Sequence, residues 1–240
     1  MTERSTDRVA IITGASRGIG AGLVEAYCKI GYRVIANSRT IGEPSQPEIV
    51  TVAGDIADLA TAHRLVETAV SRFGRIDTLI NNAGAFLAKP FTDYAPEDYA
   101  SITSVNVLGF FHVTQGVIAR MLTQGDGGHI INVTTTLAEQ AQAPVPSALT
   151  ALTKGGLVAV TRSLAVEYAG QGIRVNAISP GVIDTPMHAA VDAHRLYAGM
   201  HPLNRIGAVT DIVHGALYLE NAPFVTGEIL HIDGGQSAGH

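Results

Sequence analysis

A glycine-rich turn joins the first strand-like segment of the chain to the first helical one. Arg8–Thr13 is a short apolar run with several β-branched residues, and Gly18–Ile30 carries apolar residues at helical spacing. In the turn, Gly14 allows a sharp bend off the strand, Gly18 lets a bound group approach the backbone, and Gly20 permits close packing of helix on strand. Because the following helix offers free N–H groups and the positive end of its dipole, this segment predicts a phosphate-binding site.

Strand-like and helical segments alternate from this turn to the end of the chain. Alternation of this kind predicts a parallel sheet with helices on both faces. The chain has 240 residues, of which 46% are hydrophobic and 15% charged, which suits one large domain. We therefore expect a single α/β domain over residues 1–240, a Rossmann-type, doubly wound sheet of seven parallel strands. The further expected strands are Arg33–Asn37, Ile49–Ala53, Asp77–Asn81, His129–Val133, Ile173–Ser179 and Ile229–Asp233, and the further helices are Leu59–Phe73, Pro96–Leu122, Thr150–Ala169 and Asp211–Leu219.

The connection between the second and third expected strands is unusually short. Ser38–Glu48 contains Pro44 and Pro47, whereas a parallel crossover normally takes a dozen or more residues and usually holds a helix. We therefore expect an extended crossover that leaves one face of the sheet less covered near this edge. A simple loop shortening is the interpretation we favour, and contact of the bared face with a partner subunit is the alternative.

Composition excludes several classes of protein. The net charge of −5 argues against a nucleic-acid-binding protein, which usually carries a basic balance or patch. Cys28 is the only cysteine and no pair of histidines has convincing ligand spacing within a helix, so we expect no disulfide and no metal site. The N-terminus lacks the apolar core of a signal peptide, and no apolar run reaches membrane-spanning length. We expect a cytoplasmic protein without a membrane partner.

The end of the second expected strand bears on the choice of cofactor. In dinucleotide-binding folds an acidic residue at this place binds the adenosine ribose of NAD, whereas a nearby arginine accommodates the phosphate of NADP. This chain has Ser38 and Arg39 there, and no carboxylate before Glu43. Ser16 and Arg17, in the glycine-rich turn, are placed to add to the same phosphate pocket. The sequence therefore favours NADP over NAD; the alternative is that Arg39 is only a solvated loop residue.

Motifs spread along nearly the whole chain resemble those of the short-chain dehydrogenase/reductase family. In this order they are Thr13–Gly20, Asp55, Asn81–Gly84, Asn106 within Ser104–Val107, Pro180–Thr185, and the tail segments Val225–Glu228 and Asp233–Gly235. The resemblance implies an enzyme that exchanges hydride with a nicotinamide dinucleotide. It places Asp55 and Ile56 at the adenine, Asn82–Gly84 at the adenosine ribose, and Pro180–Thr185 at the nicotinamide. The cofactor-binding residues expected from both arguments are Gly14, Ser16, Arg17, Gly18, Ile19, Gly20, Ser38, Arg39, Asp55, Ile56, Asn82, Ala83, Gly84, Lys154, Pro180, Gly181, Ile183 and Thr185.

The resemblance also implies four catalytic positions: an asparagine, a serine, a tyrosine, and a lysine four residues after the tyrosine. Asn106 and Lys154 match two of them. The serine position falls at Thr135, with Thr136 as second choice, and a threonine hydroxyl can still donate a hydrogen bond to a substrate oxygen. The tyrosine position falls at Thr150. An aliphatic hydroxyl is a far weaker acid than a phenol and reaches less far, so Thr150 leaves a gap where the family holds its acid.

A shifted alignment does not restore the missing phenol, because no tyrosine occurs between Tyr99 and Tyr168. Three interpretations follow. In the first, the protein is a hydride-transfer enzyme whose proton comes from a water held by Lys154 and Asn106, or from a loop side chain. In the second, its substrate, such as an iminium or a conjugated alkene, needs little help with its proton. In the third, the protein binds NADP(H) without redox catalysis. We favour the first two together, with oxidoreduction of a carbonyl, alcohol or imine-like group. The titratable loop candidates are Tyr94, His188, His194 and Tyr197.

The expected partners are a small-molecule substrate and further copies of the chain. Ala85–Pro90, Thr136–Pro146 and Met187–Met200 should line a substrate pocket, and their mixed character indicates a small to medium, fairly apolar molecule. The family resemblance implies a homo-oligomer, and we expect a tetramer that packs through Pro96–Leu122 and Thr150–Ala169.

Overall fold

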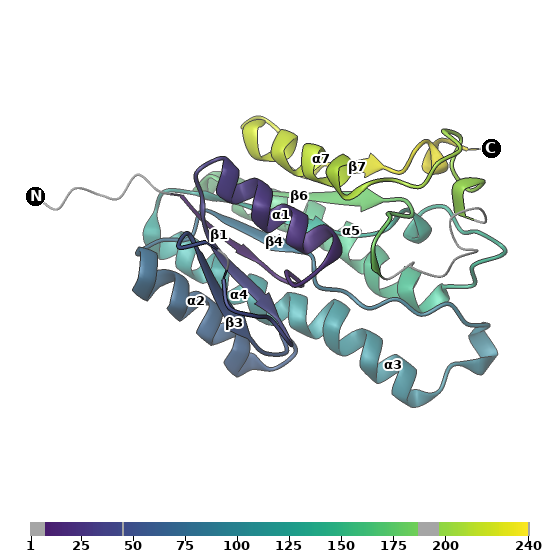
Figure 1. Ribbon diagram of the computed structural model, residues 1–240, viewed down its shortest axis with the longest axis horizontal. Coiled ribbons are helices and arrows are strands. Elements are labelled where there is room, and N and C mark those ends of the chain that lie inside the picture. Colours follow the sequence, from purple (N-terminus) through teal and green to yellow (C-terminus); the bar gives the residue numbers. More distant parts are fainter. Residues whose placement is uncertain (1–7, 45, 187–196, 240) are drawn as a thin grey trace, which may run out of the picture.

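The computed structural model describes residues 8–44, 46–186 and 197–239, and its strands form one parallel sheet (Figure 1). The sheet has seven strands in the order β3-β2-β1-β4-β5-β6-β7, which confirms the predicted doubly wound fold. Registers such as Val9 beside Arg33 and Ile12 beside Ile80 place β1 between β2 and β4. The strands are β1 (Val9–Ile12), β2 (Arg33–Ser38), β3 (Ile49–Ala53), β4 (Thr78–Asn81), β5 (Gly128–Val133), β6 (Ile173–Pro180) and β7 (Ile229–Ile232).

The strand order reverses between β1 and β4, and this position fixes where a ligand can bind. From β1 the chain builds β2 and β3 on one side, then returns to β4 on the other side. Loops that leave the carboxyl ends of β1 and β4 therefore run in opposite directions, and a crevice opens between them. The glycine-rich turn follows β1 at this crevice.

Helices cover both faces of the sheet. α1 and α7 contribute apolar residues to the core on one face, and α2, α4 and α5 contribute to the core on the other (Figure 1). The predicted two-sided covering is thereby confirmed. The helices are α1 (Gly18–Lys29), α2 (Leu59–Phe73), α3 (Pro96–Thr103), α4 (Phe110–Gln124), α5 (Ala148–Tyr168) and α7 (Val209–Asn221), with short 3₁₀ turns at Phe91–Asp93, Thr136–Ala138, Ala169–Gln171 and Gln236–Ala238.

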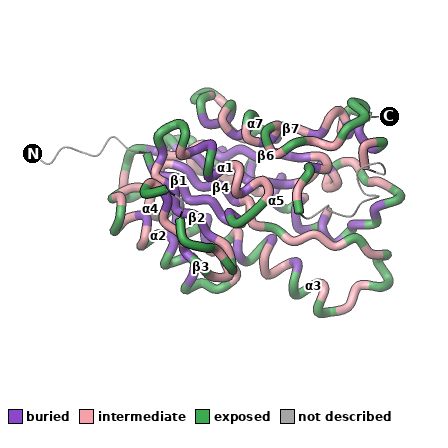
Figure 2. The backbone as a smooth tube through the Cα atoms, viewed as in Figure 1, coloured by how far each residue is buried: buried purple, intermediate pink, exposed green. Residues whose placement is uncertain are grey.

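Strand β1 shows why its sequence is apolar throughout. Val9 and Ile11 pack into the core under α2 and α4, whereas Ala10 and Ile12 pack into the core under α1 and α7. Because side chains alternate between faces, a strand covered on both sides needs apolar residues at every position. Figure 2 shows the central strands as a buried layer between more exposed helices.

The long helix expected over Pro96–Leu122 is interrupted. A π-helical segment, Ser104–Gly109, separates α3 from α4 and contains Asn106. Within Pro96–Gln124, one 18-residue window has a mean hydropathy of 1.3, so by length and composition alone this segment could cross a membrane. Val113, Val117 and Met121 of this segment are buried in the core against the sheet, and the core helix of a soluble domain passes the same test.

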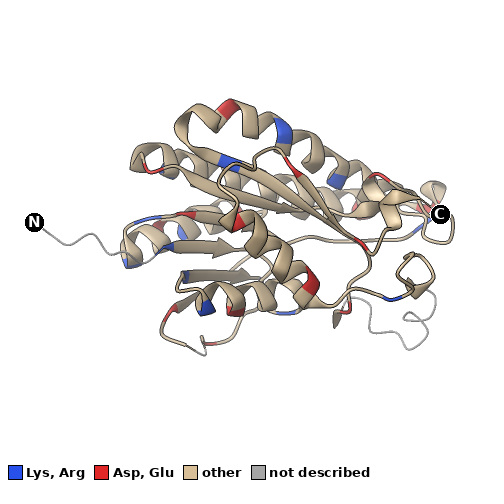
Figure 3. Ribbon diagram, turned by 90° about the horizontal axis from the view of Figure 1, so that it is seen from above, with Lys and Arg blue, Asp and Glu red and all other residues tan. Residues whose placement is uncertain are grey.

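The short crossover between β2 and β3 is extended, as predicted. Its described residues, 39–44 and 46–48, contain no helix. Ile41 in this connection packs against the core beneath α1, so the edge of the sheet is partly covered. Contact of this edge with a partner subunit stays a prediction. Charged side chains of both signs are dispersed over the view in Figure 3 rather than gathered by sign.

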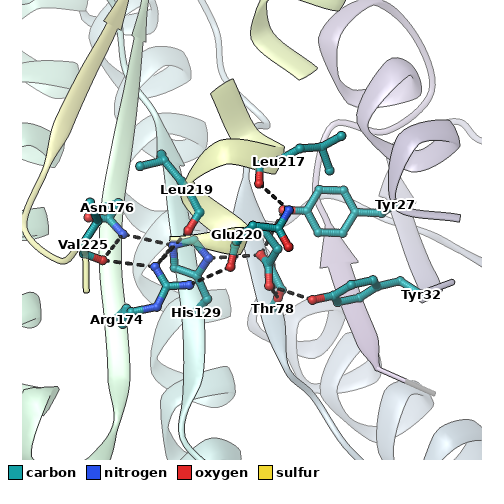
Figure 4. Close-up of polar contacts among 11 residues, drawn as sticks. Tyr27, Tyr32, Thr78, His129, Arg174, Asn176, Leu217, Leu219, Glu220 and Val225 are labelled. Atoms are coloured by element: carbon teal, nitrogen blue, oxygen red, sulfur yellow. Dashed lines mark hydrogen bonds and ion pairs between the residues drawn. The ribbon is translucent and has the colours of Figure 1, made fainter. Parts of the chain in front are cut away.

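A buried polar cluster closes the end of the sheet where β4, β5 and β6 begin (Figure 4). The carboxylate of Glu220, near the end of α7, accepts hydrogen bonds from the hydroxyls of Tyr27 (3.0 Å) and Tyr32 (2.6 Å). It also accepts from Thr78 Oγ1 at 3.1 Å and from His129 Nδ1 at 3.0 Å. These partners come from distant parts of the chain, so the cluster ties α1, β4, β5 and α7 together.

The protonation of this Glu220 cluster follows from its contacts. Asn176 Nδ2 lies 3.1 Å from His129 Nε2 and must donate to it, so the ring proton is on Nδ1 and the histidine is neutral. Burial lowers the pKa of His129 in agreement. Burial alone would raise the pKa of Glu220, but hydrogen bonds from His129, Tyr32 and Tyr27 lower it from 4.5 to about 2. A charged carboxylate is therefore held inside the protein with every near group donating to it.

Candidate active site

The glycine-rich turn after β1 has the backbone geometry that the sequence predicts. Gly14 has a φ of +65°, and a Cβ there would lie 2.8 Å from the Cα of Ala83. Gly18 has a φ of +55° and would place a Cβ 3.2 Å from Thr185. A side chain at Gly20 would collide with the carbonyl oxygen of Gly14. The turn is therefore packed between the loops after β4 and β6, with the N-terminus of α1 opening beside it.

Thr13 and Asn82 lock the turn to the loop after β4. Thr13 Oγ1 accepts from the backbone N–H groups of Asn82 (3.1 Å) and Ala83 (3.0 Å). Asn82 Nδ2 donates in return to the carbonyl oxygens of Thr13 (3.0 Å) and Gly14 (3.1 Å). The motif Asn81–Gly84 thus both closes β4 structurally and holds the crevice open at a fixed width.

The predicted phosphate-selecting residues lie together at the ends of β1 and β2. Ser16 Oγ and Ser38 Oγ are 3.0 Å apart, and Ala15 N donates to the carbonyl oxygen of Asn37 at 2.8 Å. Arg17 and Arg39 are exposed and border the same cavity. Two hydroxyls and two guanidinium groups at one mouth of a cavity make a site suited to a phosphate.

A cavity of about 430 Å³ runs along the carboxyl ends of the strands from this mouth to the loop after β6. Every residue predicted to bind the cofactor borders it, from Gly14 through Asp55 and Ile56 to Thr185. Asp55 Oδ1 accepts from Ala57 N at 2.9 Å, which orients its carboxylate at the cavity wall. Sequence motifs that are far apart in the chain therefore meet in one elongated space.

Lys154 on α5 reaches the cavity from beneath. Its Nζ donates to the carbonyl oxygen of Val133 at 2.7 Å, and a Cβ at Gly84 would lie 3.0 Å from that Nζ. Burial lowers the pKa of Lys154 from 10.5 to about 8. An ammonium group held this way is poised to receive an anionic or hydroxyl-bearing ligand in the cavity.

The two predicted hydroxyl positions both border the cavity near Lys154. Thr150 lies in the first turn of α5 and is 2% exposed, and only a long contact of 3.5 Å joins its Oγ1 to Leu87 N. Thr135 is half-buried and accepts from Leu137 N at 3.3 Å. Thr136, the second choice for the serine position, instead directs its hydroxyl to Ser179 O and to Asp233 Oδ2.

The Asn106 side chain is engaged by the backbone rather than open to the cavity. Its Oδ1 accepts from Ala85 N at 2.8 Å, and its Nδ2 donates to Ala85 O at 3.0 Å and to Thr153 Oγ1 at 3.1 Å. Asn106 is 1% exposed and does not border the cavity. The geometry therefore differs from the expected water-holding arrangement: this side chain fixes the loop after β4 to α5.

The other residues predicted as proton donors differ in whether they border the cavity. Tyr94 donates its hydroxyl to Leu87 O at 3.0 Å and does not border the cavity, whereas Tyr197 does border it. His188 and His194, with most of Met187–Met200, lie outside the described residues. The expected substrate-pocket segments contribute Ala85, Phe86, Leu137, Val145 and Met200 to the cavity wall.

The cavity wall includes polar residues that the sequence did not predict to be there, among them Ser101, Thr134 and Gln236. Gln236 follows the tail motif Asp233–Gly235 and is 1% exposed at the cavity. For Gln236, the sequence signal is a polar residue directly after the glycine pair Gly234-Gly235, which follows the last strand. It indicates a turn, and nothing in it places the side chain beside residues that precede it by about a hundred positions.

Comparison with known proteins agrees with this geometry. Residues 14–237 match the family profile described as enoyl-(acyl carrier protein) reductase. The chain belongs to the short-chain dehydrogenase/reductase family. It is therefore an oxidoreductase of that type, which uses a nicotinamide cofactor, and the predicted family and enzyme class are confirmed.

Individual relatives of the family match nearly the full length of this chain. Sorbitol dehydrogenase of Cereibacter sphaeroides is 30% identical, over 97% of this chain and 98% of the relative. The structure of ElxO with NADP bound has a TM-score of 0.90 and 27% identity and covers 98% of this chain and 100% of its own. A ketoacyl reductase from Brucella melitensis, solved with NADH, has a TM-score of 0.88 and 31% identity, with coverage of 96% and 98%.

Proposed function

We propose that this short-chain dehydrogenase/reductase uses NADP(H) to oxidise or reduce a carbonyl, alcohol or imine-like group of a small molecule. Solved relatives hold NADP in one case and NADH in another, so the preference has to come from this chain. It is supported by Arg17 and Arg39 beside the paired hydroxyls of Ser16 and Ser38, where a carboxylate would repel a phosphate.

The residues present fit a dinucleotide. The glycines of the turn leave space that a Cβ would fill, and the N-terminus of α1 opens toward it. When bound, the dinucleotide supplies or accepts a hydride, so reduction of a ketone also consumes one proton. Lys154 is placed to bind the ribose end of the cofactor, and Thr135 to donate a hydrogen bond to a substrate oxygen. Asn106 positions the loop at Ala85.

The observation that carries the proposed mechanism is Thr150 at the cavity, one helical turn from Lys154. Thr150 has no phenol of its own to give the proton. We propose that a water in the space beside Thr150, hydrogen-bonded to the Lys154 ammonium, delivers it. A pKa of about 8 makes that ammonium an effective proton source near neutral pH.

The same threonine favours one alternative, an NADP(H)-binding protein without redox turnover. The two possibilities separate in an experiment on the natural protein, Thr150→Tyr and Thr150→Phe, where the phenylalanine variant fills the space without adding an acid. NADPH affinity is measured by fluorescence, and NADPH oxidation is followed with a ketone, an imine and an enone.

We expect tight NADPH binding and measurable turnover of at least one substrate by the natural protein. Thr150→Tyr should raise the rate with the ketone by about 10²–10³-fold, whereas Thr150→Phe should not, since a positioned acid contributes on this order. Turnover that is absent in the natural protein and gained only in Thr150→Tyr supports the binding-protein alternative. Failure to bind either dinucleotide contradicts both.

We also propose that the protein is a homo-oligomer, most simply a tetramer. Large apolar side chains are exposed along α3, the π-segment and α4, and again on α5; they are Tyr99, Val107, Leu108, Phe111, Leu152 and Val166. Apolar surface of this extent on a monomer indicates an interaction site. Light scattering after size exclusion tests this, and Phe111→Lys should shift the mass toward smaller species.

A further inference from the structure

Gln236 carries a buried amide that the fold leaves without a partner. It opens the 3₁₀ turn Gln236–Ala238 after β7 and is 1% exposed. Within the described part of the chain, neither its Nε2 nor its Oε1 has a hydrogen-bond partner. A buried amide left unpaired destabilises a protein, so native structures nearly always pair such groups. An unpaired one at a cavity wall indicates that a ligand supplies the partner.

The position of Gln236 links it to the reacting end of the cavity. Asp233 Oδ2 accepts from Thr136 Oγ1 at 3.3 Å and from Ser237 N at 2.8 Å, while Gln236 N donates to Asp233 O at 3.2 Å. The turn that carries Gln236 is thus tied to the residue next to Thr135. Gly235, with a φ of +92°, completes this turn. Thr135 and Gln236 both border the cavity, so one ligand can contact both residues.

The surroundings limit what the ligand group can be. An amide offers both a donor and an acceptor, so a group that does both, a hydroxyl or a carboxamide, satisfies it, whereas a carboxylate satisfies only the donor. The buried Asp233 carboxylate in the same turn also disfavours an anion. Leu137, Val145 and Met200 supply apolar wall to the same cavity, and a polar contact beside such a wall orients a ligand.

We propose that Gln236 is a specificity-determining residue that binds a hydroxyl group of the substrate adjacent to the reacting carbonyl, so that the enzyme prefers α-hydroxyketones to plain ketones. This inference rests on the proposed function, because it assumes that the reacting carbonyl lies at Thr135. The nicotinamide carboxamide has the same donor–acceptor chemistry and is the competing source of the partner.

The experiment uses the full-length protein, Gln236→Met and the control Gln171→Met, which alters an exposed glutamine far from the cavity. Hydroxyacetone and butanone are the probes, because they differ by a hydroxyl in place of a methyl group. The measurements are the melting temperature, the NADPH affinity, the rise in melting temperature of the NADP complex with each ketone, and kcat/KM for each.

Gln236→Met should melt at the same or a higher temperature than the natural protein, since methionine fills the space without an unpaired amide. It should lower kcat/KM, or the binding-induced shift, for hydroxyacetone by about 10-fold, the worth of one buried hydrogen bond, and leave butanone and NADPH unchanged. Gln171→Met should change none of these quantities.

Several outcomes overturn the inference. A melting temperature lower by more than about 3 °C means that the amide has a structural partner. Weaker NADPH binding by Gln236→Met assigns it to the nicotinamide carboxamide. The hydroxyl contact is contradicted if the natural protein and Gln236→Met each show equal kcat/KM and equal binding-induced shifts for the two ketones, or if neither ketone binds. Discrimination in binding without any turnover leaves the inference standing and contradicts the proposed function instead.

Discussion

The two ends of the sheet bury polar groups in opposite ways. Where β4, β5 and β6 begin, the carboxylate of Glu220 is surrounded by donors from Tyr27, Tyr32 and His129. Where the strands end, the Lys154 ammonium has one carbonyl partner and the amide of Gln236 has none within the described residues. Glu220, Lys154 and Gln236 are all buried, and they differ in how fully the fold satisfies their polar groups.

This difference distinguishes a buried polar group that stabilises the folded protein from one that is available to bind a ligand. A buried charge with all its hydrogen bonds made belongs to the folded state and needs nothing else. A buried group with bonds still to make is held at a cost in stability, which a ligand can offset. Substitutions at the two ends should therefore have opposite consequences for stability and binding.

The largest expected effect is on stability at the Glu220 end. Glu220→Ala should lower the free energy of unfolding by about 3–5 kcal/mol, because it leaves buried hydroxyls and a histidine without their acceptor. Urea unfolding at neutral pH measures this. If the alanine variant does not fold, Glu220→Gln should show a smaller loss of the same sign.

Glu25→Ala is the matched control for that substitution. Glu25 is exposed and bonds Lys29 at 2.7 Å, a surface pair that solvent screens and that contributes little to stability. Losses of the same size at Glu25 and Glu220 would contradict the assignment of the Glu220 cluster as a stabilising unit.

The next effect is on acid stability. The pKa of Glu220 is lowered from 4.5 to about 2 in the folded protein, so the stability it contributes is present above pH 4.5 and is lost as the pH falls toward 2. We expect this group to account for about 2 kcal/mol of the loss between pH 6 and pH 3. Comparison of urea unfolding from pH 6 to pH 3 in the natural protein and Glu220→Gln measures it. Equal slopes in the two proteins would show that other carboxylates dominate.

At the cavity end, Arg39→Ala should weaken NADPH binding by about 10–100-fold, since a charge-assisted hydrogen bond to phosphate is lost. NADH binding should change little, and stability should stay within about 0.5 kcal/mol. Fluorescence titration with both dinucleotides measures this, with Arg72→Ala, an exposed arginine at the end of α2, as the control. An equal loss for NADPH and NADH would refute the phosphate pocket at Arg39.

The smallest expected effect is the pH dependence of NADPH binding. An anionic ligand favours the protonated form of Lys154, whose pKa is about 8 without ligand. Affinity should therefore be constant below about pH 7 and fall by about 10-fold or more between pH 7 and pH 9.5. Lys154→Met should bind more weakly at every pH and lose this dependence. A slope that persists in Lys154→Met would assign the titration to another group.

Much of the architecture was predictable from local sequence. The periodicity of Ile49–Ala53 and of Leu59–Phe73 predicted β3 and α2 with their observed ends. The long helix after Pro96 was predicted only in part. The helix is interrupted by a π-helical segment that contains Asn106, and Asn106 is hydrogen-bonded to Ala85. Periodicity does not predict this contact, because Ala85 lies in a loop distant in the sequence.

The candidate site divides along the same line. The glycines of the turn and the residues predicted to bind the cofactor could be placed at one cavity from the sequence, because the strand–turn–helix pattern and the motif order are local properties; all of those residues border the cavity. The part played by Asn106 was not predictable, since it depends on which backbone groups lie beside its amide. Gln236 was missed for the same reason.

The sequence by itself determined the alternation of strands and helices, the glycine-rich turn at Gly14, and the presence of a threonine at position 150. These follow from spacing and residue type, which act over a few positions. Only the tertiary structure decided which buried polar groups are satisfied. Glu220 is 193 positions from Tyr27 and 142 from Thr78, and hydrogen bonds of a few ångströms form only once the fold has brought such residues together.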